Sequence, residues 1–315
     1  MSHVAQWIRQ LSQKTQRCLY TIQLDGVDLL RQLKFEEFLY RKVAPVAEGC
    51  AFFLVNNHRR TGSRAVVMGF SGNERDFVKD PEETKARGVS IIRRFTGGGT
   101  VIVDECSLNT SLIASTQIAK NMSPNLICNW SYDNVFKDCG IFSDRFAVVE
   151  GDFVVKDVRK MQSCEQGARE PTEDSSHSYY KVAGNSQAFN HLAFVHHSVF
   201  LWSMSPLISQ ILLHPKKTPN YRDGRDHMSF LRSIREALDT NCNVSTIDDF
   251  ERALCNRGAK NLLERMNRKV HVIVSATAEE DGDILQSLHR NSVLLSDKLI
   301  DDAIAMLHRP VTEVV

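Results

Sequence analysis

Three consecutive glycines, Gly97, Gly98 and Gly99, stand between two segments rich in β-branched and other apolar residues, 89–95 and 100–104. Glycine loses more backbone entropy on folding than any other residue, so a run of three is costly unless the chain needs it. Without Cβ atoms, the backbone N–H groups of such a loop can closely approach a phosphate or carboxylate. The segment therefore predicts two strands joined by an anion-binding loop, and the alternative is a loose hairpin turn.

The residues around the glycines indicate which type of anion-binding loop this is. Arg93 and Arg94 precede it and carry guanidinium groups that suit oxyanions. The Walker A pattern of phosphate-binding loops is absent, and Gly97-x-Gly99 is not followed by the third glycine of the dinucleotide-binding fingerprint. We therefore expect a different nucleotide-binding geometry.

A second informative segment is K-V-A-G-N-S-Q-A, which begins at Lys181. A lysine that leads a strand into a Gly-Asn turn can present its ammonium group to a phosphate as a mobile point charge. Most lysines are solvated surface residues, so this segment gains weight only in combination with the glycine loop.

The overall composition is that of an ordinary globular enzyme. The chain has 315 residues, 42% of them hydrophobic, and its 39 Lys and Arg against 38 Asp and Glu give a formal net charge of +1. This balance argues against a dedicated nucleic-acid binder. No stretch approaches the roughly 18 uninterrupted apolar residues of a membrane span. The eight cysteines form no CxxC pair, so neither structural zinc nor a disulfide scaffold is predicted.

The first 24 residues contain no Asp or Glu, while Val4, Trp7, Ile8 and Leu11 have the spacing of one helical face. A basic, acid-free amphipathic start is typical of a mitochondrial transit peptide. We therefore expect residues 1–17 to be a targeting segment and the protein to be mitochondrial, or otherwise cytoplasmic. The alternative is a surface helix of the mature fold.

Apolar periodicity predicts the order of the elements. Strands are expected at 18–24, 51–56, 63–69, 108–115, 147–150, 153–156, 179–183, 196–202 and 270–275, and helices at 25–43, 133–139, from Thr246, and at 296–308. Residues 157–178 are polar without a sustained apolar period, which indicates an inserted mobile loop. The character changes near residue 240, so 239–315 is predicted to form a small C-terminal subdomain.

These segments, taken together and in order, resemble the lipoate–protein ligases of the biotin/lipoate ligase superfamily. The resemblance runs from about Leu19 to Ile234. It rests on V-V-M-G (66–69), R-R-F-T-G-G-G-T-V-I-V-D, E-G-D-F-V-V (150–155), K-V-A-G-N-S-Q and H-H-S-V-F-L-W. The later stretch P-N-Y-R-D-G-R-D-H-M-S-F-L (219–231) looks like the short plant-type members.

The resemblance implies an α/β fold of the α+β type, with mixed, largely antiparallel β-sheets packed with helices in a catalytic domain at 18–238. It also implies that lipoate reacts with ATP, in the presence of Mg²⁺, to give lipoyl-AMP, and that a lysine of an acceptor protein then takes the lipoyl group. The implied acceptors are the lipoyl domains of 2-oxoacid dehydrogenase acyltransferase subunits and the glycine-cleavage H protein. A monomer without nucleic-acid or membrane partners is expected.

The resemblance also implies residue roles. Lys181 is the expected catalytic residue, and Gly69, Gly98 and Lys181 are expected at the lipoate pocket. Asp152 is either a magnesium ligand or the partner that holds Lys181. The residues expected to bind ATP and lipoyl-AMP are Arg94, Gly97, Gly98, Gly99, Thr100, Val101, Ile102, Val103, Asp152, Lys181 and Asn185.

Some features depart from the family, and other functions stay open. Phe95-Thr96 stands where bacterial members often have Arg-Ser, which puts one adenylate contact in doubt. An ATP-independent lipoyl or octanoyl transferase would need a positioned thiol, for which Cys106 and Cys139 are candidates. A non-catalytic lipoate-binding protein is a third possibility, and biotin ligation is disfavoured. The pair His196 and His197 would point to opposite faces of a strand, so packing and hydrogen bonding are expected rather than a shared metal.

Overall fold

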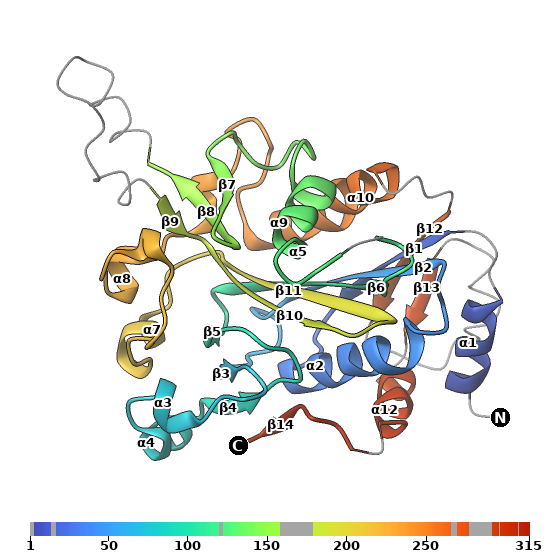
Figure 1. Cartoon of the computed structure of the whole chain (residues 1–315), viewed down its shortest axis with the longest axis horizontal. Coiled ribbons are helices and arrows are strands. Elements are labelled where there is room, and N and C mark those ends of the chain that lie inside the picture. The colour runs from blue at the N-terminus through green and yellow to red at the C-terminus, as the bar shows by residue number, and fades with distance from the viewer. Residues whose placement is uncertain are drawn as a thin grey trace.

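A seven-stranded mixed sheet forms the centre of the fold, with the strand order β10-β11-β6-β2-β1-β12-β13 (Figure 1). The computed structural model describes residues 3–13, 17–119, 122–157, 179–265, 270–276, 292–295, 297–307 and 309–315. The strands of this sheet are β1 (Cys18–Leu24), β2 (Cys50–Asn57), β6 (Ser107–Ser115), β10 (Ala183–Phe189), β11 (Ala193–Leu201), β12 (Val270–Ala276) and β13 (Ser292–Leu295).

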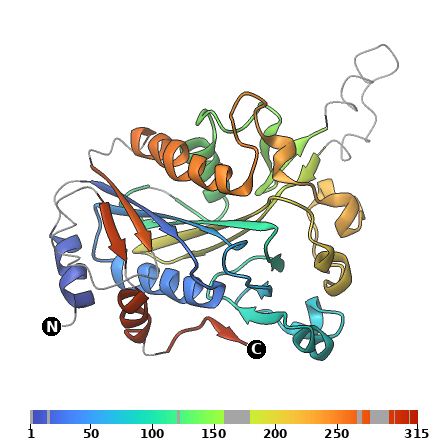
Figure 2. The same ribbon diagram turned by 180° about the vertical axis from the view of Figure 1, so that it is seen from behind.

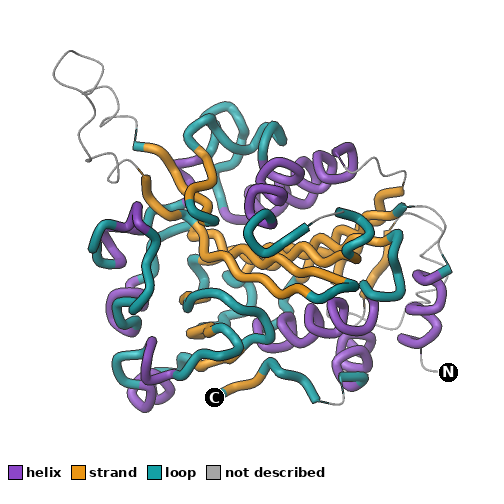
Figure 3. The backbone as a smooth tube through the Cα atoms, viewed as in Figure 1, coloured by secondary structure: helices purple, strands orange, loops and turns teal. Residues whose placement is uncertain are grey.

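Two smaller sheets lie beside the central one (Figure 3). One has the order β14-β4-β3-β5, and the other has the order β7-β8-β9. Antiparallel pairs outnumber parallel pairs over the three sheets, which confirms the predicted fold class. The strands are β3 (Ala65–Met68), β4 (Ser90–Arg93), β5 (Val101–Val103), β7 (Phe146–Val149), β8 (Asp152–Lys156), β9 (Tyr179–Lys181) and β14 (Glu313–Val314).

Helices cover both faces of the central sheet (Figures 1 and 2). On one side are α1 (His3–Ser12), α2 (Leu29–Phe38) and α12 (Asp297–Ala305), and on the other are α5 (Ile127–Ser131), α9 (Ile247–Ala253) and α10 (Ala259–Arg265). Successive side chains of a strand point to opposite faces, so Phe52 packs in the first layer and Phe53 in the second. The remaining helices are α3 (Glu74–Phe77), α4 (Pro81–Ala86), α7 (Pro206–Ile211), α8 (His227–Phe230), the π-helical turns η1 (Leu39–Val43), η2 (Tyr132–Phe136) and η6 (Leu254–Gly258), and the 3₁₀ turns η4 (Asn220–Arg222) and η5 (Ile234–Ala237).

The segment predicted as a targeting peptide folds onto the core. Helix α1 buries Val4, Trp7 and Leu11 in the same cluster as the side chains of α2 and α12. This burial accounts for the apolar face seen in the sequence. Mitochondrial targeting stays a prediction.

The C-terminal segment contributes to the sheets formed by the rest of the chain, so its predicted separation as a subdomain is corrected. Strand β12 pairs in parallel with β1, and β14 pairs with β4. Helix α12 is tied to α2 by Arg31, whose Nε lies 2.7 Å from Asp301 Oδ1. An alternating strand pattern cannot show which strand will be its neighbour, so the sequence did not reveal these pairings.

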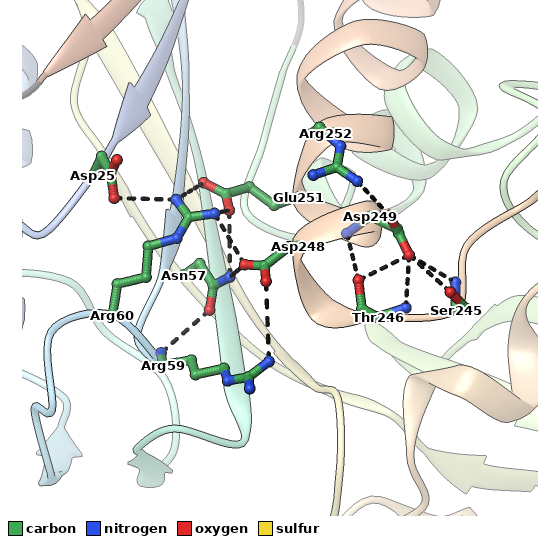
Figure 4. A network of polar contacts seen from close by, with 10 residues as sticks. All are labelled: Asp25, Asn57, Arg59, Arg60, Ser245, Thr246, Asp248, Asp249, Glu251 and Arg252. Carbon is green, nitrogen blue, oxygen red and sulfur yellow. Dashed lines mark hydrogen bonds and ion pairs between the residues drawn. The ribbon is translucent and has the colours of Figure 1, made fainter.

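Helix α9 is attached to the ends of β1 and β2 by a network of charged groups (Figure 4). Arg60 lies at its centre, 3.1 Å from Asp25, 2.9 Å from Asp248 and 2.8 Å from the buried Glu251. The helix begins after Thr246, as predicted, with a capping box in which Thr246 and Asp249 accept hydrogen bonds from each other's backbone N–H groups.

Two further predictions concern membrane-spanning helices and the inserted loop. Within the described part of the chain, no helix combines the length and the apolar character that crossing a membrane requires. Of the predicted inserted loop at 157–178, only Asp157 belongs to the described residues.

Candidate active site

The glycine loop crosses the end of strand β3 and does not close a hairpin. Strands β4 and β5, which flank the loop, do not pair with each other; β4 pairs in parallel and β5 antiparallel with β3, which lies between them. The loose-hairpin alternative is therefore wrong. Because β3 ends beneath the loop, Gly69 lies directly under it: a Cβ atom there would be 2.7 Å from the Gly98 carbonyl oxygen.

The three glycines have different surroundings. Gly98 has a φ of +105°, and a Cβ atom there would meet the Asn185 carbonyl oxygen at 3.0 Å. The Gly97 N–H donates to the Gln187 carbonyl oxygen on β10 at 2.9 Å, so this N–H is used within the fold. At Gly99, an added Cβ would meet nothing within 4 Å. Conformation and space therefore require glycine at 98, and space alone requires it at 69.

Arg94 supports the loop from inside. Its buried guanidinium donates four hydrogen bonds to protein oxygens, to Thr96 Oγ1 and to the carbonyl groups of Val67, Gly97 and Gly99. Burial lowers the pKa of Arg94 to about 10, which leaves it charged at neutral pH. These bonds give Arg94 a positioning role for the loop and the end of β3, and its direct contact with a nucleotide stays a prediction.

Lys181 lies at the end of β9, where Asp152 at the start of β8 faces it. Lys181 Nζ donates to Asp152 Oδ1 at 2.7 Å, and the Tyr221 hydroxyl donates to Asp152 Oδ2 at 2.9 Å. Both side chains of the Lys181–Asp152 ion pair are partly buried, with exposed fractions of 23% for Lys181 and 14% for Asp152. Burial, followed by the charge of Asp152, raises the pKa of the Tyr221 phenol. The tyrosine therefore stays a donor and holds the carboxylate in place.

These bonds bear on one of the two roles predicted for Asp152. Each of its oxygens already accepts a hydrogen bond from the protein, and Lys181 balances its charge. Among the residues that the structure describes, no three His, Cys, Asp or Glu side chains gather in a group that could hold a metal ion. These bonds support the role of Asp152 as the partner that holds Lys181, and its role as a magnesium ligand stays a prediction.

An outer cavity of about 550 Å³ lies between the glycine loop and Lys181. Six predicted binding residues line it: Gly98, Gly99, Thr100, Val101, Ile102 and Lys181. Its rim carries the exposed Lys216 and Lys217 and the buried Arg222, while Leu201, Ile208, Leu212 and Phe230 form an apolar wall. Within the described residues, Nη2 of Arg222 is buried and has no hydrogen-bond partner, while the residue as a whole lines the cavity.

A second, inner cavity lies behind the loop and has a volume of about 20 Å³. Val67 and Val103 contribute to its apolar lining, and its polar lining includes Glu36 and His197, whose carboxylate and imidazole lie 3.0 Å apart. Burial alone would raise the pKa of Glu36, but His197 and the hydrogen bonds to Glu36 lower it. His196, on the opposite face of β11, contacts Ser131 at 2.8 Å, which confirms the expectation for this histidine pair.

Asn185 and a cysteine lie between the loop and the Lys181–Asp152 pair. Asn185 Nδ2 donates to the Gly151 carbonyl oxygen at 3.1 Å and contacts Cys128 Sγ at 3.4 Å. Burial, followed by the charge of Asp152, raises the pKa of the Cys128 thiol. Cys139 donates to Phe136 and Cys106 lies near Asp104, so neither of the two predicted thiols contacts this group.

Sequence reasoning missed several of these residues. Tyr221 and Arg222 lie in the stretch P-N-Y-R-D-G that carries the family resemblance, which was the available signal for them. Glu36 and Cys128 belong to helices whose apolar spacing predicts only packing. They reach the site because α2 and α5 pack on opposite faces of the central sheet.

The fold and this site can be compared with known proteins. Residues 28–257 match the family described as the lipoyl protein ligase A/B catalytic domain. The chain belongs to this family. The match contains the glycine loop, the Lys181–Asp152 pair and the 219–231 stretch, so the resemblance inferred from short segments is confirmed.

Individual relatives agree with this assignment. The chain is 30% identical over 267 residues to a protein of Plasmodium falciparum named inactive lipoate–protein ligase 2. This match covers 73% of this chain and 66% of that protein. The chain therefore spans just under two thirds of that relative's length.

Two solved structures share the fold. One is an archaeal two-part lipoate protein ligase from Thermoplasma acidophilum, described with its E2 lipoyl domain, at TM-score 0.56, 18% identity and 92% coverage of each chain. The other is lipoate–protein ligase A bound with ATP, at TM-score 0.51 and 18% identity, covering 90% of this chain and 93% of that one.

Proposed function

We propose that this protein converts lipoate and ATP to lipoyl-AMP and pyrophosphate, and then transfers the lipoyl group to a lysine of a lipoyl-domain protein. The observation that carries the proposal is the position of Lys181. It is held by Asp152 at the wall of a cavity whose opposite wall is the glycine loop. This geometry supports the proposal of an anion site between a fixed cation and the backbone of the glycine loop.

In the first step, a lipoate carboxylate oxygen attacks the α-phosphorus of ATP, and pyrophosphate leaves. Negative charge grows on the phosphate oxygens, so fixed donors lower the barrier. Lys181 and Arg222 supply positive charge from the cavity wall, and the loop at Gly98 and Gly99 supplies backbone N–H groups. The magnesium that accompanies ATP would be carried by the phosphates, since the described part of the chain has no group of three or more His, Cys, Asp or Glu side chains for it.

In the second step, the amine of an acceptor lysine attacks the carbonyl carbon of the mixed anhydride, AMP leaves, and the amine loses a proton. We propose lipoyl domains of 2-oxoacid dehydrogenase acyltransferase subunits and the glycine-cleavage H protein as acceptors, in mitochondria. The archaeal relative described with an E2 lipoyl domain supports this class of partner. Both steps depend chiefly on positioning, so the same cavity can serve both.

Transfer without ATP is the alternative function, and Cys128 is the observation that favours testing it. This thiol lies beside Asn185 and near Lys181, where an acyl-cysteine could form. Its burial raises its pKa, however, and disfavours the thiolate that would attack an acyl carrier.

The deciding experiment measures the two steps separately. Pyrophosphate release is followed with ATP and either lipoate or octanoate, and lipoylation of a lipoyl domain is followed by its mass. A third arm supplies synthetic lipoyl-AMP and the lipoyl domain without ATP, and a fourth arm supplies a lipoylated or octanoylated carrier protein and the lipoyl domain without ATP. We expect pyrophosphate release with ATP and lipoate. We also expect lipoylation of the lipoyl domain, both with ATP and lipoate and with synthetic lipoyl-AMP. Transfer from lipoyl-AMP without any release would limit the function to the second step. Transfer only from an acylated carrier would establish the ATP-independent alternative, and activity in no arm would contradict an enzymatic role.

A further inference from the structure

The outer and inner cavities of the site share three lining residues, Val101, Gly184 and Val199. These three residues form the wall that separates the glycine loop and Lys181 on the outer side from Glu36 and His197 on the inner side. A molecule that extends from the outer cavity into the inner one across this shared lining passes them.

The wall consists of one side chain seated in a gap left by a glycine. Gly184 on β10 faces Val199 on the neighbouring strand β11. A Cβ atom at Gly184 would lie 2.3 Å from Val101 Cγ1, far inside any van der Waals contact. The backbone at Gly184 does not have a positive φ, so glycine is needed there for space alone. Val101 therefore occupies the volume that a side chain at 184 would fill.

The size of the inner cavity shows what this arrangement controls. A volume of about 20 Å³ holds about one water molecule and no acyl chain. Its lining is nevertheless partly apolar, through Leu29, Leu33, Val67 and Val103. An apolar chain attached to a carboxylate at the glycine loop can reach this lining only if Val101 turns or moves away from Gly184. Val101 begins β5 directly after the loop, so a ligand held by the loop adjoins it.

We propose that the Val101 side chain, seated on Gly184, is the residue that sets the length and bulk of the acyl group this enzyme accepts. The proposal rests on the proposed function, because it assumes that the outer cavity holds the activated carboxylate. It adds that the acyl chain passes the Val101–Gly184 contact and ends in the inner cavity.

The test measures the binding of a series of acids, by calorimetry, to the wild-type protein and to three variants. The series is hexanoate, octanoate, lipoate and decanoate, each with a non-hydrolysable ATP analogue present. Val101→Ala removes the methyl groups of the wall and is expected to raise the affinity ratio of decanoate to hexanoate about tenfold. Gly184→Ala is expected to reduce binding of all acids of eight or more carbons at least tenfold, because its methyl group forces Val101 toward the chain.

The double variant Val101→Ala/Gly184→Ala separates this role from a general disturbance of the fold. Removal of the Val101 Cγ atoms eliminates the clash, so the double variant is expected to regain binding that Gly184→Ala alone has lost. If the two substitutions only damaged the structure, the losses of binding that each causes would instead add up in the double variant. Leu213→Ala, which shortens a side chain of the outer cavity alone, serves as the control and is expected to leave the decanoate-to-hexanoate ratio within twofold.

The outcomes distinguish the two proposals. If the wild type binds lipoate but Val101→Ala leaves the chain-length ratio unchanged, the role of Val101 is overturned and the proposed function stands. The same holds if the double variant binds no better than Gly184→Ala. If neither the wild type nor any variant binds an acid of the series, both proposals are overturned.

Discussion

Lys181 Nζ and Asp152 Oδ1 lie 2.7 Å apart, on the adjacent antiparallel strands β9 and β8. This bond fixes the ammonium group of Lys181, and Asp152 is fixed in turn by the Tyr221 hydroxyl at 2.9 Å. A cation that already has its position when the phosphate arrives needs little reorganisation during the reaction. Removing the charge of Lys181 and removing the hydroxyl that holds Asp152 are therefore expected to have different effects.

Lys181→Ala is expected to lower the rate of lipoate-dependent pyrophosphate release by about 10²–10³-fold, the usual effect of removing one group that stabilises transition-state charge. The fold should persist, because the lysine side chain is partly exposed at the cavity wall. Circular dichroism and thermal unfolding check the fold. Near-normal turnover by a folded variant would contradict the assignment of Lys181.

Tyr221→Phe removes only the hydroxyl that holds Asp152 and leaves the Lys181–Asp152 ion pair. We expect a smaller loss, of about tenfold or less, and expect it in the turnover rate rather than in the KM for ATP. Steady-state kinetics, with the ATP concentration varied at saturating lipoate, measures the turnover rate and the KM for ATP separately. An effect as large as that of Lys181→Ala would show that Tyr221 contacts the substrate itself.

The support of the glycine loop by Arg94 predicts an effect on stability. Arg94→Lys keeps a positive charge but cannot donate to Val67, Gly97 and Gly99 together, so buried carbonyl groups lose their partners. The free energy of unfolding should fall by about 1–3 kcal/mol. Arg93→Lys is the matched control, since Arg93 binds the exposed Glu313, and a change below about 1 kcal/mol is expected for a surface ion pair. Urea denaturation compares the two; equal effects would contradict the role of Arg94.

The two neighbouring glycines of the loop are predicted to respond differently to the same substitution. Gly98→Ala places a Cβ at a positive φ and about 3 Å from Asn185 and Ser186, so the unfolding free energy should fall by about 1–3 kcal/mol. Gly99→Ala meets nothing within 4 Å and should change it by less than about 1 kcal/mol. Denaturation of both variants, in parallel with the wild type, is the measurement. Equal destabilisation would mean that the loop has another conformation.

The sequence predicted much of the fold because most strands bury alternating or continuous apolar runs, as Cys18–Leu24 does over its full predicted length. It did not predict which strands pair. The parallel neighbours of β1 come from residues 50–57 and 270–276, and periodicity within each segment contains no information about the other.

The same limit applies to the site. Gly98 and Lys181 were predictable because local chemistry marks them, namely a costly glycine run and a lysine before a Gly-Asn turn. Arg94 was expected to face the ligand because guanidinium groups suit oxyanions, but the carbonyl oxygens of its own loop satisfy it first. Glu36 and His197 meet only after α2 packs on the sheet, so no local signal pointed to their contact.

The buried His196 predicts a stability that depends on pH. Burial, followed by the charge of His197, lowers the pKa of His196 to about 3 from an ordinary value of 6.5. The unfolded chain therefore binds a proton at higher pH than the folded protein does. The contribution of the neutral imidazole to stability is complete above pH 6.5 and is lost as the pH falls toward 3, by up to about 1.4 kcal/mol per pH unit.

Urea denaturation at several pH values between 7.5 and 4.5 measures this dependence. Other groups titrate in the same range, so the informative quantity is the difference in slope between the wild type and His196→Asn. The variant lacks the titrating imidazole and can still bond Ser131, so its unfolding free energy should fall less steeply below pH 6, by up to about 1.4 kcal/mol per pH unit. His191→Asn, at an exposed position, is the control and should keep the wild-type slope. A His196→Asn slope equal to that of the wild type would mean that His196 takes up its proton in the folded protein as readily as in the unfolded chain, and that its burial has no effect on its titration.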